Sequence, residues 1–386
     1  MKKYALTAIA LAMALALPAL SITPAHAGTY TQKNALEPWP EWNELNNSNA
    51  PALVKTPKYS RSALYTKTNS YETKPNTIKT KKGNANYTFK TQFFLPITYK
   101  KAGDWSDTQS FAFAGDYLYV LSTVRGHSDS QAWITRYDTA ALKAAGVDKA
   151  GTNMKELRLT VTKMGKGGSM NATEKKVKAA IKKGPVFNAG HGQGLSYNPV
   201  RDSLFTWSYK AGTDNMQLQE IDIATLKVKN TWVFGMFNVG GKRVVKAKGV
   251  FNLDWDSEGN FYFDQVQVSP SPGTSSGSVK IFVGQIKGKK VTVRALPQTI
   301  KHRPGTLDQG LGVNRALNRL YLVSDDAFYS LPLDKALAGE LKKTDMEYTV
   351  LDSKRECEGI KFDEQGRAYM LINSGSEIIR ATEILD

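Results

Sequence analysis

The chain has 386 residues, of which 41% are hydrophobic and 10% are aromatic. These fractions exclude an intrinsically disordered protein, because disordered chains hold too few large apolar residues to bury a core. The 52 basic and 35 acidic residues give a formal net charge of +17, which favours anionic partners such as wall polymers, lipid headgroups or acidic polysaccharides, although the same charge also keeps a protein soluble.

The N-terminus has the form of a secretory signal peptide. Lys2 and Lys3 precede a long apolar run, and Ala25 and Ala27 form a small-x-small cleavage pattern. We therefore expect a signal peptide over residues 1–27, cleavage near Ala27 and a secreted, extracellular protein. The mature chain then has 50 basic and 35 acidic residues and a net charge of +15. No later apolar run reaches the roughly 20 residues that span a bilayer, so we expect no transmembrane segment.

The only cysteine, Cys357, excludes an intramolecular disulfide. An exported protein without disulfides is more typical of Gram-positive bacteria. Cys357 stands at the start of an expected strand, where a buried and inert thiol is commoner than a reactive one.

Residues 28–84 are rich in Asn, Thr, Lys and Pro and show no sustained periodicity. We predict a flexible extension here, followed by a β-rich domain over residues 85–386. Regular strand patterning begins with the segment YTFKTQFFLPITYK at residues 87–100.

Five similar hairpins follow this segment. In each of them an alternating apolar strand leads into a polar turn and a second strand rich in aromatic and β-branched residues. The first strands contain Gln109-Ser110-Phe111, Gln193-Gly194-Leu195, Phe251-Asn252-Leu253, Gln309-Gly310-Leu311 and Glu358-Gly359-Ile360. The second strands are YLYVL, LFTWS, FYFDQ, LYLVS and AYMLI, and successive copies start 84, 58, 58 and 49 residues apart.

Further strand patterns lie between the hairpins. The third strands are AWITRYD, MQLQEIDI, SVKIFVGQI, AFYSLPL and SEIIRATEI, and the fourth are LRLTVTKM, NTWVFGMF, KVTVRALP and MEYTVLD. The fifth unit ends after three strands, and the segment near residues 87–97 is left over before the first unit. Units of four strands at this spacing predict an all-β protein, a β-propeller of five blades, in which the N-terminal strand completes the last blade and closes the ring. A two-sheet sandwich is the alternative.

The long first interval contains a lysine-rich insert at about residues 163–185. Its segment NATEKKVKAAIKK, residues 171–183, has helical spacing and an Asn start, so we predict a short exposed helix. Five of its side chains form a candidate contact for a polyanion: Lys175, Lys176, Lys178, Lys182 and Lys183. The alternative is an ordinary solvated face.

The sequence contains no HExxH, CxxC or P-loop motif. We therefore predict no catalytic residue, metal or cofactor, and the pattern leans against an enzyme. A Ser-His-Asp triad that is assembled only in space leaves no such motif, so enzymatic activity stays open.

The propeller prediction gives a place for a binding site. Inner strands of a propeller start at one rim of a central aqueous channel, where ligands bind. Polar residues stand at these starts, namely Asp107, Gln109, His191, Gln193, Asp308, Gln309, Glu356 and Glu358. We predict a ligand-binding rim with Gln193, Gln309 and Glu358 at one opening. Carboxylates and imidazole also suit a divalent ion such as Ca²⁺, and hydrogen bonding between blades is the plain alternative.

Several segments carry a resemblance to a known family. QSFAFAGDYLYVLS, GHGQGLSYNPVRDSLF, FNLDWDSEGNFYF and ECEGIKFDEQGRAYMLI, together with the export signal, resemble the helveticin J-like family of large, heat-labile (class III) bacteriocins of lactic acid bacteria. The resemblance covers roughly residues 105–386. It implies a secreted antimicrobial protein that kills related Gram-positive cells, and it brings no catalytic set. The long N-terminal extension and the lysine-rich insert depart from the family pattern and leave the target range open.

We therefore expect a cationic bacteriocin that binds an anionic polymer or glycan of the bacterial envelope and no nucleic acid. Two alternatives stay open. The hairpins, especially EGIKFDEQGRAYML, also resemble those of metal-dependent lactonase or lyase propellers, in which a channel Glu holds a divalent ion. The other alternative is a wall glycan-binding module without killing activity.

Overall fold

The computed structural model describes residues 28–38, 43–48, 74–96, 107–124, 131–151, 153–209, 213–246, 252–266, 277–305, 307–351, 353, 355–373 and 376–384. The signal peptide predicted over residues 1–27 lies outside this part of the chain, as does Phe251 of the third hairpin.

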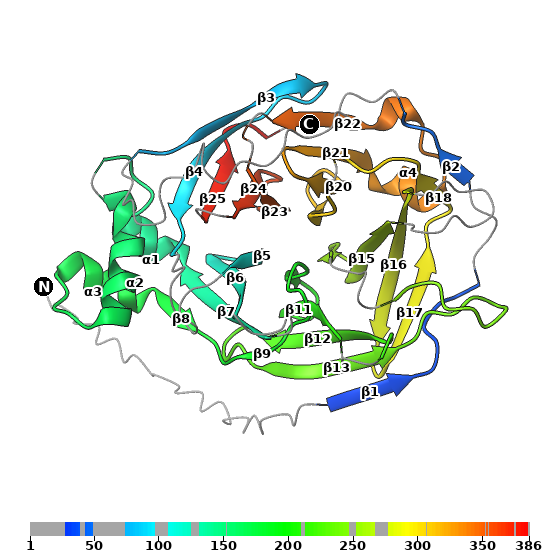
Figure 1. Ribbon diagram of the computed structural model, residues 1–386, viewed down its shortest axis with the longest axis horizontal. Coiled ribbons are helices and arrows are strands. Elements are labelled where there is room, and N and C mark those ends of the chain that lie inside the picture. Colours follow the sequence, from blue (N-terminus) through cyan, green and yellow to red (C-terminus); the bar gives the residue numbers. More distant parts are fainter. Residues whose placement is uncertain are drawn as a thin grey trace, which may run out of the picture.

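Strands dominate the described residues and form four hydrogen-bonded sheets. The sheets surround a common centre (Figure 1) and divide into five modules in chain order. Module 1 contains β5 (Thr108–Ala114), β6 (Tyr117–Thr123), β7 (Gln131–Asp138), β8 (Ile181–Lys183) and β9 (Phe187–Asn188). Module 2 contains β10 (Ser196–Asn198), β11 (Ser203–Ser208), β12 (Met216–Asp222) and β13 (Val228–Phe234). Module 3 contains β14 (Asp254–Trp255), β15 (Asn260–Val266), β16 (Val279–Lys287), β17 (Lys290–Ala295) and β18 (Gln298–Ile300). Module 4 contains β19 (Gly310–Asn314), β20 (Arg319–Ser324), β21 (Ala327–Pro332) and β22 (Glu347–Leu351). Module 5 contains β23 (Cys357–Phe362), β24 (Ala368–Ile372) and β25 (Glu377–Ala381).

The first strands of the five modules contact one another in a closed circuit. β5 lies against β10 and β23, β14 lies against β10 and β19, and β19 lies against β23. The last of these contacts is tight, because a Cβ atom added to Gly310 would lie 2.6 Å from the Cα atom of Gly359. Later strands of each module follow outward from this circuit, in the order that the hydrogen bonds give.

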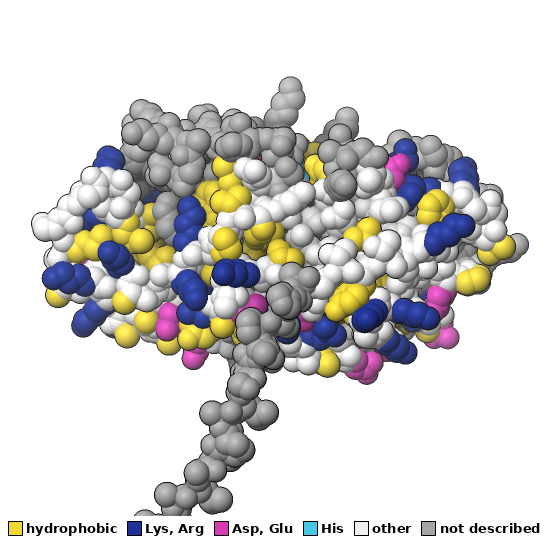
Figure 2. Space-filling view, turned by 90° about the horizontal axis from the view of Figure 1, so that it is seen from below, with side chains coloured by type: hydrophobic (Ala, Val, Ile, Leu, Met, Phe, Trp, Pro, Cys, Tyr) yellow, Lys and Arg dark blue, Asp and Glu magenta, His cyan; other side chains and the backbone are white. Residues whose placement is uncertain are grey.

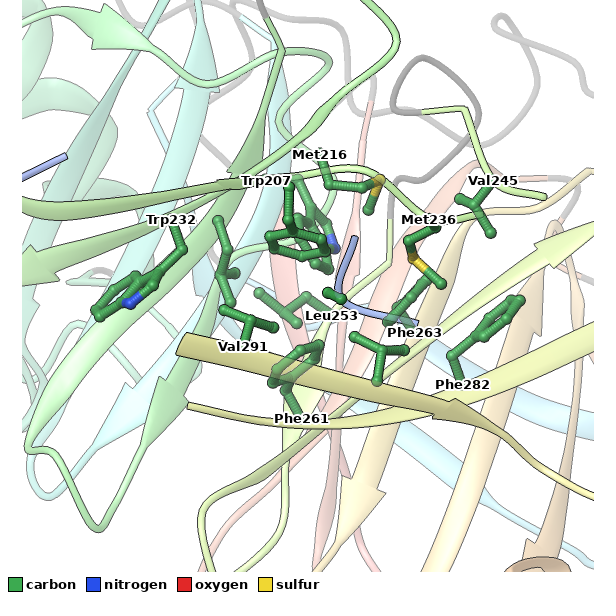
Figure 3. Close-up of a cluster of buried hydrophobic side chains, with 14 of the residues drawn as sticks. Trp207, Met216, Trp232, Met236, Val245, Leu253, Phe261, Phe263, Phe282 and Val291 are labelled. Carbon is green, nitrogen blue, oxygen red and sulfur yellow. The ribbon is translucent and has the colours of Figure 1, made fainter. Parts of the chain in front are cut away.

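Each pair of neighbouring modules also shares a cluster of buried hydrophobic side chains. Figure 3 shows the cluster between modules 2 and 3, where the rings of Trp207 and Phe263 have centroids 5.3 Å apart. The indole N–H of Trp207 donates to the carbonyl oxygen of Asn252 at 2.9 Å, so its polar atom is satisfied. Burial of such rings removes a large apolar surface from water and fixes one module against the next.

Most of the strand predictions are confirmed, although the first strands of modules 2 and 3 start later than predicted, at Ser196 and Asp254. The predicted fourth strand LRLTVTKM is instead helix α2 (Glu156–Lys166), so that prediction was wrong. Leu157 and Val161 are four residues apart and both buried, on a helix that packs against α3 (Ala172–Ala179) and a strand from the N-terminal segment. Thr and Val favour strands only weakly, and packing of this helical face overrides their preference.

The predicted helix in the insert is confirmed as α3. Asn171 Oδ1 accepts from the backbone N–H of Glu174 at 2.8 Å, and the carboxylate of Glu174 accepts from the backbone N–H of Asn171 at 2.8 Å. This reciprocal cap fixes the start of the helix. The helix ends earlier than predicted because β8 occupies the last residues of the segment and pairs with β7.

The remaining described helices are short. They are α1 (Thr139–Ala144), α4 (Leu333–Ala338) and the 3₁₀ turns η2 (Asn153–Lys155) and η4 (Lys343–Asp345). Within the described residues, no helix combines the length and the apolar character needed to cross a membrane.

Three strands come from the segment that the sequence predicts as a flexible extension. β1 (Gly28–Gln32) pairs in parallel with β13, and β2 (Asn43–Leu45) pairs in parallel with β18. β3 (Thr77–Gly83) pairs antiparallel with β22. For these strands the prediction of an extension without regular structure was wrong. They attach through backbone hydrogen bonds and bury few side chains, so their polar sequences carry little strand signal.

The strand β4 (Thr88–Phe94) pairs antiparallel with β25 and completes module 5, as the leftover N-terminal segment predicts. Phe89 stands opposite Ala381, and its buried ring packs against Tyr87 and Phe328 with centroids 5.4 and 6.4 Å apart. Because β3 also pairs with β4, modules 4 and 5 share one nine-stranded sheet.

Candidate functional site at the centre of the ring

Three of the predicted rim residues meet at the centre. Gln193 precedes module 2, Gln309 precedes module 4 and Glu358 lies on β23 of module 5. Gln193 Nε2 donates to Gln309 Oε1 at 2.8 Å and to Glu358 Oε2 at 3.2 Å. Modules 2 and 4 are not neighbours in the circuit, so the first bond crosses the centre of the ring. The predicted grouping of these side chains is confirmed, and ligand binding by them stays a prediction.

Two residues that sequence reasoning missed complete this group. Asn373 Nδ2 donates to Glu358 Oε1 at 2.9 Å, and Gln309 Nε2 donates to Asp325 Oδ1 at 3.3 Å. Asn373 directly follows β24 and Asp325 directly follows β20. In a hairpin, the end of the second strand lies beside the start of the first strand. A polar residue directly after a second strand therefore indicates a further side chain at the centre of the ring. We call Gln193, Gln309, Asp325, Glu358 and Asn373 the central cluster.

The carboxyl groups of the central cluster hold their protons more tightly than usual. Burial, and then the negative charge of Glu356, raises the pKa of Glu358 well above its usual range. Burial, and then the charge of the same neighbour, raises the pKa of Asp325 to about 6. A buried carboxyl group that keeps its proton donates as well as accepts hydrogen bonds. Within the cluster, Asp325 therefore changes its charge in the weakly acidic range.

A second polar group contains Asp308, another predicted rim residue. Asn252 Nδ2 donates to Asp308 Oδ1 at 2.7 Å and to Asp264 Oδ1 at 2.8 Å. Burial, followed by the charge of Asp308, raises the pKa of Asp264, and burial also raises the pKa of Asp308. One amide therefore bridges two carboxyl groups that do not both ionise easily.

The other predicted rim residues are Asp107, Gln109, His191 and Glu356, of which only Glu356 acts on the central cluster through its charge. Asp107 and Gln109 are half-buried, and the carbonyl oxygen of Asp107 accepts from the backbone N–H of Thr123 at 2.9 Å. His191 is exposed, and Glu356 is half-buried next to the central cluster, where its charge acts on two carboxyl groups.

A deeper layer of side chains crosses the centre a second time. Lys361 Nζ donates to the carbonyl oxygen of Leu253 at 3.0 Å and lies 3.2 Å from Asp254 Oδ2, so it joins module 5 to module 3. Arg315 Nη2 of module 4 donates to the carbonyl oxygen of Tyr197 in module 2 at 2.8 Å. These side chains and the central cluster occupy the centre, where the sequence predicts an aqueous channel. The polar side chains therefore bond to one another across the ring, and the aqueous channel stays a prediction.

The described residues contain no group of three or more His, Cys, Asp or Glu side chains that is arranged to hold a metal ion. Cys357 is fully buried, as predicted, and burial raises the pKa of its thiol.

The predicted polyanion contact lies on α3 and on β8 of module 1. Lys175, Lys176 and Lys178 are exposed on α3, and Lys182 and Lys183 are exposed on β8. Lys182 Nζ donates to the carbonyl oxygen of Ala224 at 2.5 Å, and Lys183 Nζ lies 3.9 Å from the ring centroid of Trp133. We call these five side chains the lysine surface. Figure 2 shows that the positive charge is also widespread, because Lys and Arg clearly exceed Asp and Glu on the side it presents.

No family model matches the sequence, and no curated protein matches it. Solved structures show a distant likeness. Hydrazine synthase of Kuenenia stuttgartiensis is 13% identical, with a TM-score of 0.36, over 72% of this chain and 84% of its own. A glucose dehydrogenase is 9% identical, with a TM-score of 0.35, over 75% of this chain and 84% of its own. A carbohydrate-active enzyme of family AA12 from Trichoderma reesei is 9% identical, with a TM-score of 0.39, over 86% of this chain and 98% of its own.

Proposed function

We propose that the five modules are the blades of a five-bladed β-propeller and that β4 closes its ring. Two observations support this proposal. The first strands contact one another in a closed circuit, and each neighbouring pair of modules shares a hydrophobic cluster. A propeller has this radial repetition, with short and protected sheet edges.

We also propose that the mature chain is a secreted antibacterial protein that acts on related Gram-positive cells after it binds an anionic component of their envelope. The observation that carries the proposal is the lysine surface, where five exposed lysines lie on two adjacent elements of a chain whose mature net charge is +15. Surface cations attract anionic polymers through a field that salt screens over about 10 Å at 0.1 M. The proposal that the protein kills cells is supported by the predicted export signal and by the resemblance to the helveticin J-like family.

The test uses purified mature protein, isolated cell walls and live cells of a panel of lactobacilli and related strains. We expect killing of at least one strain, and wall binding that weakens as salt rises from 50 to 500 mM. A variant with Lys175, Lys176, Lys178, Lys182 and Lys183 replaced by Gln should bind walls at least tenfold more weakly and lose killing.

The control removes the same charge elsewhere, by replacing five other exposed lysines, Lys79, Lys82, Lys90, Lys287 and Lys290, with Gln. It should bind within threefold of the unmodified protein. A panel of strains left unharmed would rule out the antibacterial function. Wall binding that does not change with salt, or that is equal in the two variants, would show that the lysine surface does not bind the wall.

A further inference from the structure

A groove lies at the opposite end of the ring from the central cluster. Its volume is about 780 Å³. The turns between the first and second strands of all five modules contribute to it, through Asp116, Pro199, Ser257, Ala316 and Glu364. Small-molecule sites in proteins have volumes of roughly 300–1,000 Å³. The groove is therefore large enough for a ligand of several rings.

Aromatic rings form part of the groove wall. Phe113 on β5 and Phe362 on β23 are only half-buried, which leaves part of each ring facing the groove. The ring of Phe113 packs against Tyr369, with centroids 4.7 Å apart, and the ring of Phe362 packs against Tyr321 at 4.5 Å. Each exposed ring is thus held by a second ring behind it. Fixed apolar faces of this kind bind flat apolar surfaces at a small cost in conformational entropy.

Fixed polar groups lie beside these rings. Arg315 Nε donates to the carbonyl oxygen of Trp255 at 2.9 Å, and with its bond to Tyr197 this holds the guanidinium in one orientation. Asp363 accepts from the backbone N–H of Arg367 at 2.8 Å and from the hydroxyl of Tyr369 at 3.3 Å. The groove therefore offers both donors and acceptors in set directions, which a ligand rich in hydroxyl groups can use.

The charge of the groove differs from that of the rest of the protein. Among the described residues that line it are three cationic side chains, Lys143, Arg315 and Arg380, and three acidic side chains, Asp116, Asp363 and Glu364. In a mature chain with a net charge of +15, this local balance gives a polyanion no net attraction. An uncharged polar ligand can bind there without any net charge in the groove.

We propose that this groove binds an uncharged oligosaccharide, whose sugar rings pack their apolar faces on Phe113 and Phe362 while their hydroxyl groups bond to Arg315 and Asp363. The site is separate from the lysine surface, and its occupancy does not depend on killing. Sugars present both an apolar ring face and a rim of hydroxyl groups, which matches the two kinds of wall in the groove.

The test titrates the mature protein with tetrasaccharides of glucose, N-acetylglucosamine, mannose and galactose, and with tetraglycine, by isothermal calorimetry. We expect at least one tetrasaccharide to bind with a millimolar or lower Kd that rises less than twofold between 50 and 500 mM salt. Phe113→Leu keeps an apolar side chain but removes the ring face, so it should weaken binding at least tenfold without loss of the cooperative thermal transition.

The matched control is Phe237→Leu, since Phe237 is also half-buried but lies outside the groove. It should bind as the unmodified protein does, and so should the variant that lacks the lysine surface. The inference is overturned by four outcomes: no tetrasaccharide binds at 10 mM, Phe113→Leu binds unchanged, Phe237→Leu weakens binding equally, or tetraglycine binds in place of the sugars.

Discussion

Lys361 is a buried cation on the axis of the ring, and its ammonium lies 3.2 Å from Asp254 Oδ2. Burial, the largest effect, lowers the pKa of Lys361, and the neighbouring carboxylate opposes that change. Removal of one member of such a pair leaves the other charge buried and uncompensated, which costs about 3–5 kcal/mol. We predict that Lys361→Met lowers the free energy of unfolding, measured in urea, by about 3 kcal/mol.

Lys335 provides a control, because its Nζ lies 2.6 Å from Asp345 Oδ1 but its side chain is partly exposed. Lys335→Met should change the free energy of unfolding by less than about 1 kcal/mol, because exposed pairs contribute little. Equal losses in the two variants would contradict the role given to the buried pair.

Asp325 gives the central cluster a measurable pH dependence. Its pKa rises from an unfolded value of about 3.9 to about 6 in the folded chain, through burial first. The folded state therefore binds this proton more tightly, so its stabilising contribution is complete below pH 4 and is lost as the pH rises through 6. We predict that Asp325→Asn is more stable than the unmodified protein by about 2 kcal/mol at pH 7 and not at pH 4.

Urea unfolding at pH 4, 5, 6 and 7 measures this difference. A constant difference between Asp325→Asn and the unmodified protein across the four pH values would show that the carboxyl group does not titrate as described.

The sequence predicts part of the site at this scale. Gln193, Gln309 and Glu358 could be found because they occupy the same position in three repeated hairpins. Asn373 and Asp325 do not stand in the first strands, whose starts predict the rim. They follow second strands, which end beside the starts of the first strands. The layer around Lys361 carries no sequence signal, since Lys361 stands in a strand pattern that equally suits an exposed side chain.

At the scale of elements, the contact between β19 and β23 depends on two glycines. A Cβ atom on Gly310 would lie 2.6 Å from Gly359 Cα, which is closer than real atoms approach. We predict that Gly310→Ala lowers the free energy of unfolding by about 1–3 kcal/mol, because the strands must move apart. Gly165 in α2 has no heavy atom within 4 Å of the added Cβ, so Gly165→Ala should instead stabilise the chain by about 1 kcal/mol. A stability gain in both variants would contradict the close approach of the strands.

The strands that can be predicted from the sequence are those that bury side chains on one or both faces. The second strands are almost wholly buried, and their aromatic and β-branched residues predict them well. β1, β2 and β3 could not be predicted, because an outer strand held by backbone bonds leaves no apolar pattern. The helix α2 was predicted as a strand because its Thr and Val residues suit a strand, and only its packing against α3 and β4 reveals the helical stripe.

At the scale of the whole molecule, the ring is closed where β4, from the N-terminal part of the chain, pairs with β25, from the C-terminal part. Neighbouring modules share apolar clusters, and side chains of modules 2 and 4, and of 3 and 5, bond across the centre. The repeat spacing predicts the radial arrangement and the closing strand, while the bonds across the centre could be found only from the contacts themselves.

Amide hydrogen exchange of the mature protein tests this closure most directly. We predict that the amides of β4 exchange slowly and together with those of β24 and β25, since the three strands form one hydrogen-bonded unit. Exchange of β4 at the rate of an unstructured peptide, while β25 stays protected, would contradict the closed ring.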